Sequence, residues 1–175
     1  NDVDDLITYI RDHSQSLHID KERLGIWTCS AGAPFGLRAA LYETPTYVRC
    51  LVCYYGITEL EAYYQAWYGE DDSEDQRSRP FFTEEDFAEF SGVDLLRTRS
   101  GEITPMFIAR AGLDDPTLNE SLDRFINEAI AQNVELDVMN HPTGQHGFDI
   151  LDDDARSEAI IQATLDFMHR NLKAS

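Results

Sequence analysis

A serine within a run of small residues is the first feature of the sequence that could do chemistry. Residues 25–36 read Gly-Ile-Trp-Thr-Cys-Ser-Ala-Gly-Ala-Pro-Phe-Gly, an apolar run followed by small residues. Thr28 and Gly32 flank Ser30 two places away on either side, a spacing typical of the sharp strand-to-helix turn that presents a nucleophile. We therefore predict that Ser30 attacks an acyl carbonyl carbon and that the N–H of Ala31 donates to the resulting oxyanion.

Cys29 is a second candidate nucleophile in the same turn. If the turn were centred on Cys29, its flanking residues would be Trp27 and Ala31. Strand and helix pass close together at such a turn, so a tryptophan is hard to accommodate in the flanking position. We therefore favour Ser30, although Thr28 stands where glycine is the usual residue of the motif.

Two adjacent acids follow an apolar run further along the chain. Residues 108–116 read Ile-Ala-Arg-Ala-Gly-Leu-Asp-Asp-Pro, so Asp114 and Asp115 come just after a predicted strand. A carboxylate in that place can fix the tautomer of a catalytic histidine and stabilise the imidazolium that forms. Both acids fit this role, and both also suit the cap of a helix that begins at Pro116. We favour Asp114 as the acid of the site and keep Asp115 as the alternative.

A histidine between glycines follows the last predicted strand. Residues 140–149 read Asn-His-Pro-Thr-Gly-Gln-His-Gly-Phe-Asp, and the glycines around His146 leave room for its imidazole to reach a nucleophile. We predict that His146 is the base. His141 is the alternative, but its place at the end of a strand favours a structural role or a place in the wall of a pocket. The remaining histidines are expected on helix surfaces or helix ends: His13, His18 and His169.

These candidate residues follow segments that alternate between strand and helix patterns. The order serine, aspartate, histidine, each after a successive strand, is the chain order of one type of hydrolase triad. Predicted strands cover residues 24–29, 48–55, 105–111 and 134–139, and predicted helices cover residues 2–17, 31–42, 118–132 and 155–172. Such alternation implies parallel pairing and right-handed crossovers. We therefore expect an α/β fold, with a parallel sheet flanked by helices.

Residues 57–101 interrupt this alternation, before the third predicted strand. We interpret them as a lid-like helical insertion within a single domain that covers residues 1–175. The insertion contains an aromatic helix-like segment, an acidic loop and a second short helix. We expect Trp67 and Phe148 to contact the substrate, with Tyr63 and Phe81 as further candidates for the same pocket. For each of these aromatic residues, packing in the core or in the lid is the equal alternative.

The composition excludes several classes of partner. A net charge of −19 repels phosphate backbones, so we expect no nucleic-acid partner. No apolar stretch is long enough to cross a bilayer and no leader-like segment opens the chain, so we expect a cytoplasmic protein without membrane contacts. The histidines are scattered and no glycine-rich phosphate loop is present, so we expect neither a metal nor a cofactor. Cys50 and Cys53 lie three apart in one predicted strand and face opposite sides, which favours packing over metal or redox chemistry.

Four short motifs carry a resemblance to a known family. They are residues 28–32 (Thr-Cys-Ser-Ala-Gly), 54–56 (Tyr-Tyr-Gly), 111–115 (Ala-Gly-Leu-Asp-Asp) and 144–148 (Gly-Gln-His-Gly-Phe). With them the chain resembles the C-terminal half of a serine α/β-hydrolase of the dienelactone-hydrolase-like or carboxylesterase-like kind. Dienelactone hydrolases use a cysteine nucleophile, and here Cys29 falls one residue away from that place.

The resemblance implies hydrolysis of a small-molecule carboxylic ester through an acyl-enzyme, without a cofactor. Peptidase, thioesterase and acyltransferase relatives use the same triad, so the sequence leaves these activities open. A different class of function also stays open, in which the chain is a non-catalytic fragment or an interaction module.

The resemblance further implies strands before the nucleophile and an upstream loop, often His-Gly-Gly, that supplies a second oxyanion N–H. Without them, the predicted strand at residues 24–29 is an exposed apolar edge. We therefore expect a truncated or cleaved chain that either forms a homo-oligomer or pairs with a missing N-terminal segment.

Overall fold

A parallel sheet forms the centre of the protein. The computed structural model describes residues 2–42, 45–68, 82–98 and 101–173. Its four strands are β1 (Leu24–Cys29), β2 (Val48–Tyr54), β3 (Met106–Ala111) and β4 (Leu136–His141). They lie in the order β1-β2-β3-β4, and each neighbouring pair is parallel. The predicted fold class is therefore confirmed, and all four carboxyl ends meet at one edge of the sheet.

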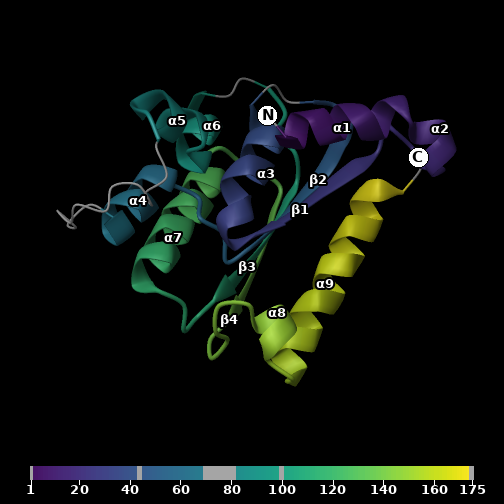
Figure 1. Cartoon of the computed structure of the whole chain (residues 1–175). Coiled ribbons are helices and arrows are strands. Elements are labelled where there is room, and N and C mark those ends of the chain that lie inside the picture. Colours follow the sequence, from purple (N-terminus) through teal and green to yellow (C-terminus); the bar gives the residue numbers. More distant parts are fainter. Residues whose placement is uncertain (1, 43–44, 69–81, 99–100, 174–175) are drawn as a thin grey trace.

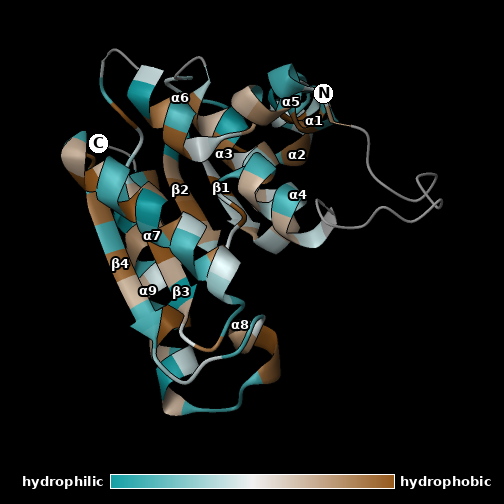
Figure 2. Ribbon diagram, turned by 90° about the vertical axis from the view of Figure 1, so that its left-hand side faces the viewer, coloured by the Kyte–Doolittle hydropathy of each residue, from teal (hydrophilic) through white to brown (hydrophobic). Residues whose placement is uncertain are grey.

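Helices cover both faces of this sheet (Figure 1). On one face, α3 (Ala33–Leu41), α6 (Gly92–Thr98) and α7 (Pro116–Ala131) enclose a core that includes Leu37, Leu96 and Phe125. On the other face, α9 (Ala155–Leu172) and the short α8 (Phe148–Leu151) enclose a second core, with Ile160 and Phe167. Figure 2 shows brown, hydrophobic residues along β2 between helices of mixed colour. Within the part of the chain that the structure describes, every helix is too short or too polar to span a bilayer.

The strands differ in how deeply they are buried. In β2, every residue except Arg49 is buried, as expected for a strand with neighbours on both sides and helices on both faces. In β1, only Thr28 is buried, and Trp27 is 42% exposed. Among the described residues, no strand pairs with the outer edge of β1.

The predicted elements occur, but several of their ends differ. The predicted helix over residues 2–17 is divided into α1 (Asp2–Asp12) and α2 (Ser14–Leu17), which ends at His18 with a left-handed backbone. The fourth strand begins at Leu136, two residues later than predicted. The reason is that Asn133 has a φ of +54° and the N–H of Val134 still donates to the end of α7.

The described residues of the segment predicted as an insertion form the helices α4 (Leu60–Tyr68), α5 (Glu84–Glu89) and α6. The acidic loop and Phe81 lie outside the described residues. The sequence pattern missed α6, whose residues Val93, Leu95 and Leu96 are buried in the main core. This helix is therefore part of the domain itself, and the lid-like role of the other two stays a prediction.

Gly36→Ala tests how closely β1 and α3 approach each other. A Cβ atom at Gly36 would lie 2.7 Å from the Cβ of the buried Thr28. Because neither atom belongs to a flexible chain end, we expect the free energy of unfolding to fall by about 1–3 kcal/mol in chemical denaturation. Gly32→Ala is the matched control, since its nearest neighbour, Thr28 Oγ1, would be 3.3 Å away. Equal losses in the two variants would contradict the close approach.

Candidate active site

The predicted nucleophile lies where β1 ends. Ser30 follows Cys29 directly and opens a short 3-10 turn, residues 30–32, before α3. Its φ is +51°, a conformation that costs about 1–3 kcal/mol for a residue other than glycine, and residues strained in this way cluster at functional sites. The N–H of Ile57 donates to the carbonyl oxygen of Ser30 at 3.1 Å, which helps to hold this turn. The local backbone therefore has the strained geometry that the spacing of small residues predicts.

Three of the predicted residues come together at the carboxyl edge of the sheet. Ser30 Oγ lies 2.8 Å from His146 Nε2, and His146 Nδ1 lies 2.7 Å from Asp114 Oδ2. The Asp114 side chain is 5% exposed, whereas the His146 side chain is 40% exposed. With Nδ1 protonated, His146 donates to the carboxylate and its Nε2 is free to accept the serine proton. The arrangement can therefore move a proton from Ser30 to His146, while the catalytic roles themselves stay predictions.

The two loops that carry the acid and the histidine are joined by backbone hydrogen bonds. The N–H of Gly112 donates to the carbonyl of His141 at 2.8 Å, and the N–H of Leu113 donates to the carbonyl of Gly144 at 2.9 Å. A Cβ atom at Gly112 would lie 2.5 Å from the carbonyl oxygen of Pro142, so only glycine fits there. This close approach positions Asp114 beside His146.

Asp115 has a different place. Its side chain accepts from the N–H of Thr117 at 2.8 Å and caps the amino end of α7, where Pro116 is the first residue. Its own N–H donates to Asp114 Oδ1 at 2.8 Å. Of the two acids that the sequence left open, Asp114 contacts the histidine and Asp115 caps the helix and supports Asp114.

The other predicted site residues are more dispersed. Phe148 is completely buried and stacks on Tyr54 with 5.6 Å between ring centroids, and its contact with substrate stays a prediction. Its apolar ring belongs to the core under α9. Trp67 is 56% exposed on α4 and packs on Tyr63, and its contact with substrate stays a prediction. Ala31 is exposed in the turn after Ser30, where its role as an oxyanion donor also stays a prediction.

His141 is almost fully buried, with 1% of its surface exposed. Its Nε2 lies 3.1 Å from both Asp154 Oδ2 and Ser157 Oγ, which is a structural arrangement at the start of α9. The hydrogen bond from the backbone N–H of Ser157 is the largest effect on the pKa of Asp154 and, with those from Arg156 and His141, lowers it against the opposing effect of desolvation. The side chains of His141, Asp152 and Asp154 offer ligand atoms that lie within 4.8 Å of one another and are of the types that bind metal ions. Both carboxylates already accept hydrogen bonds from protein groups, whereas His141 Nδ1 is buried without a hydrogen-bond partner.

The sequence-based prediction gives no role to Tyr55, which lies beside His146, or to Asp149, which contacts Tyr55. The ring centroid of Tyr55 lies 4.6 Å from that of His146, and its hydroxyl donates to Asp149 Oδ1 at 2.5 Å. The motif Tyr-Tyr-Gly at residues 54–56 is visible in the sequence, but nothing in its pattern indicates that one tyrosine reaches the histidine.

The three cysteines differ in environment. Cys29 is exposed, whereas Cys50 and Cys53 are buried on opposite faces of β2. Burial raises the pKa of Cys50 to about 11 and that of Cys53 to about 12. Both buried thiols are therefore protonated at neutral pH, as expected of packing residues.

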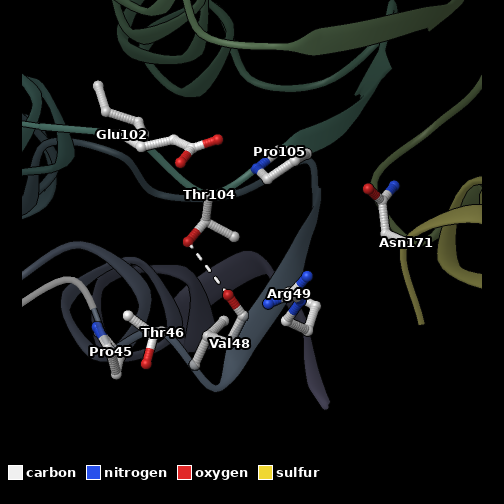
Figure 3. Close-up of a pocket in the computed structure, with 9 residues that line it drawn as sticks. Pro45, Thr46, Val48, Arg49, Glu102, Thr104, Pro105 and Asn171 are labelled. Atoms are coloured by element: carbon white, nitrogen blue, oxygen red, sulfur yellow. Dashed lines mark hydrogen bonds between the residues drawn. The ribbon is translucent and has the colours of Figure 1, made fainter. Parts of the chain in front are cut away.

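A cavity of about 250 Å³ lies at the other end of the sheet (Figure 3). Its walls include Val48 at the start of β2, Pro105 just before β3 and Asn171 near the end of α9. Thr104 Oγ1 donates to the carbonyl of Val48 at 3.4 Å across part of this hollow. Because the cavity opens at the amino ends of the strands, it is remote from Ser30.

The parallel sheet, the strained serine and the order of the site residues define an α/β-hydrolase fold. Solved structures share this fold. Carboxyl esterase 2 of Tuber melanosporum is 16% identical with a TM-score of 0.68, and the match covers 96% of this chain and 60% of that one. Dipeptidyl peptidase 4 of Porphyromonas gingivalis is 16% identical with a TM-score of 0.72, over 97% of this chain and 22% of that one, and esterase 2 of Thermogutta terrifontis is 14% identical with a TM-score of 0.71, over 97% and 64%. The chain thus spans less than two thirds of each of these proteins.

The chain belongs to the prolyl oligopeptidase family, whose family model matches residues 1–175. No curated protein sequence matches it significantly. Family and fold agree with the resemblance to a serine α/β-hydrolase that the four short motifs carry.

The variants Asp115→Ala and Asp114→Ala test which of the two acids caps α7 and which one contacts His146. We expect Asp115→Ala to lower the free energy of unfolding by about 1 kcal/mol, because α7 loses its cap. In the same variant, the proton NMR signal of His146 Nδ1–H should persist, since the Asp114 carboxylate still protects it from exchange. Asp114→Ala should abolish that signal. The assignment is contradicted if the signal survives in Asp114→Ala and disappears in Asp115→Ala.

Thiol alkylation checks the environments of the cysteines. At neutral pH the folded protein should take up one iodoacetamide adduct, at Cys29, because the buried thiols are inaccessible and protonated. Intact-mass measurement should then give three adducts after denaturation, one for each cysteine. Rapid modification of Cys50 or Cys53 in the folded protein would show that β2 is less buried than the structure indicates.

Proposed function

We propose that this protein is a serine hydrolase that cleaves carboxylic esters through an acyl-enzyme. The observation that carries the proposal is the continuous hydrogen-bonded chain from Ser30 Oγ through His146 to the buried Asp114 carboxylate. The serine at one end of this hydrogen-bonded series is strained, and the acid at the other end is almost fully buried.

The proposed reaction has two halves. In the first, Ser30 Oγ attacks the acyl carbon and His146 Nε2 takes the hydroxyl proton, while Asp114 stabilises the imidazolium. The tetrahedral oxyanion accepts a hydrogen bond from the N–H of Ala31. The bond between the acyl carbon and the leaving oxygen then breaks, and His146 returns the proton to the departing alkoxide. In the second half, His146 Nε2 takes a proton from a water whose oxygen attacks the acyl carbon. The bond between that carbon and Ser30 Oγ then breaks, His146 returns the proton to Ser30 Oγ, and the acid product leaves.

A complete oxyanion site needs a second N–H donor near Ala31. We infer that this donor comes from a segment or a second subunit that lies along the outer edge of β1. The inference is supported by the unpaired edge of β1 in the described chain and by the exposure of Trp27. It fits the expectation that the chain works as a homo-oligomer or together with an N-terminal segment.

Peptide hydrolysis is the second candidate. It is favoured by membership of the prolyl oligopeptidase family and uses the same residues, with an amine as the leaving group. Thioester hydrolysis and acyl transfer differ only in the leaving group or the acceptor, and no residue of the site favours them. A non-catalytic module remains the alternative from a different class.

A fluorophosphonate probe and two substrates test the proposal. The unmodified protein and Cys29→Ala should react with the probe and hydrolyse p-nitrophenyl acetate, and Ser30→Ala should lose at least about 1,000-fold in turnover because the nucleophile is gone. A peptidyl p-nitroanilide with the same acyl group measures peptidase activity in parallel. Faster cleavage of the anilide favours the peptidase. Labelling that persists in Ser30→Ala and vanishes in Cys29→Ala would show that the nucleophile is misassigned, and no reaction with any reagent favours the non-catalytic module.

A further inference from the structure

Tyr55 has an unusual backbone directly after β2. Its φ is +36°, which is rare for a bulky residue and persists only where the surroundings hold it in place. The N–H of Tyr55 donates to the carbonyl of Ala109 at 2.8 Å, and its side chain is buried, with only 4% of the residue exposed. Ser30 shows the same left-handed conformation at the end of the neighbouring β1. Two adjacent strands thus end in strained residues at the same edge of the sheet.

The strained backbone directs the Tyr55 ring between the histidine loop and the core. Its centroid lies 4.6 Å from that of His146, with the two planes inclined at 56°. It also meets Phe148 edge to face at 5.7 Å. Phe148 and Asp149 belong to α8, which begins two residues after His146, directly after the left-handed Gly147. Tyr55 therefore contacts the histidine itself and the helix that follows it.

The hydroxyl of Tyr55 fixes this contact. It donates to the carboxylate of Asp149 at 2.5 Å, and a hydrogen bond to an ionised acceptor is about twice as strong as a neutral one. Burial, followed by the hydrogen bond to Asp149, raises the pKa of Tyr55 above its ordinary value. The phenol thus stays protonated and continues to donate throughout the neutral range.

We propose that Tyr55 is a positioning residue, which together with Asp149 sets the rotation of the His146 ring. This rests on the proposed function, in which His146 is the base. In the free protein, Ser30 and Asp114 hold the two ring nitrogens. Once Ser30 Oγ carries the acyl group, its hydrogen bond to His146 Nε2 is lost. The orientation of the ring during deacylation then depends on Asp114 and on the packing of Tyr55.

This account makes deacylation the sensitive step. Tyr55→Phe keeps the aromatic ring but loses the bond to Asp149, and Asp149→Asn weakens the same bond from the other side. In both variants we expect steady-state turnover of p-nitrophenyl acetate to fall on the order of 10-fold, because a misplaced base slows attack by water. The initial burst of p-nitrophenol should persist, since Ser30 still orients His146 during acylation.

Tyr54→Phe is the matched control. Tyr54 is the last residue of β2 and directly precedes Tyr55. It is fully buried, and its hydroxyl also makes a short contact, 2.6 Å from Thr164 Oγ1. This variant loses a comparable buried hydrogen bond next to the same residues, on the side of the core that faces α9. It should retain the turnover and the ratio of burst rate to steady-state rate of the unmodified protein.

A second readout does not depend on activity. The proton NMR signal of His146 Nδ1–H should broaden in Tyr55→Phe and in Asp149→Asn, and stay sharp in Tyr54→Phe. The proposal is overturned if Tyr55→Phe and Tyr54→Phe behave alike, or if acylation and deacylation slow by the same factor. If the unmodified protein neither reacts with a fluorophosphonate nor turns over ester, the proposed function fails. The NMR comparison still decides whether Tyr55 positions the ring.

Discussion

The hydrogen bond between Ser30 Oγ and His146 Nε2 joins residues 116 positions apart, and the rest of the structure makes it possible. It requires the carboxyl ends of β1 and β4 to lie at the same edge of the sheet, although β2 and β3 lie between these two strands. The loop after β3 supplies Asp114. Parallel pairing meets this requirement because every crossover helix returns the chain to the same starting edge. The two cores on either side of the sheet keep the four strands in register.

Close backbone approaches provide the remaining precision. Gly36 lets α3 come against Thr28, and Gly112 lets the acid loop come against the histidine loop. At each glycine, an added methyl group would collide with the neighbouring segment. The strain at Ser30 and at Tyr55 is maintained by these rigid surroundings, which is how a folded protein can hold reactive groups in conformations that an isolated chain would avoid.

Much of this could be predicted from the sequence. Small residues around Ser30, apolar runs and helical periodicity locate the turn, the strands and the long helices. The choice between Asp114 and Asp115 depends on the directions of the two side chains after a turn, and the periodicity of apolar residues does not predict these directions. The places of the Phe148 and Tyr55 rings are not fixed by the sequence for a related reason. Whether an aromatic ring faces the core or the histidine is decided by contacts with distant elements. The helices α6 and α8 are too short to show a clear pattern.

The central claim is that Ser30 is the nucleophile of a hydrolase, and peptide mapping by mass spectrometry after reaction with a fluorophosphonate tests it most directly. Trypsin should release the segment from Leu24 to Arg38, which contains both Cys29 and Ser30. Fragmentation should then place the phosphonyl group on Ser30. An adduct on Cys29, or no adduct on this segment, would contradict the account.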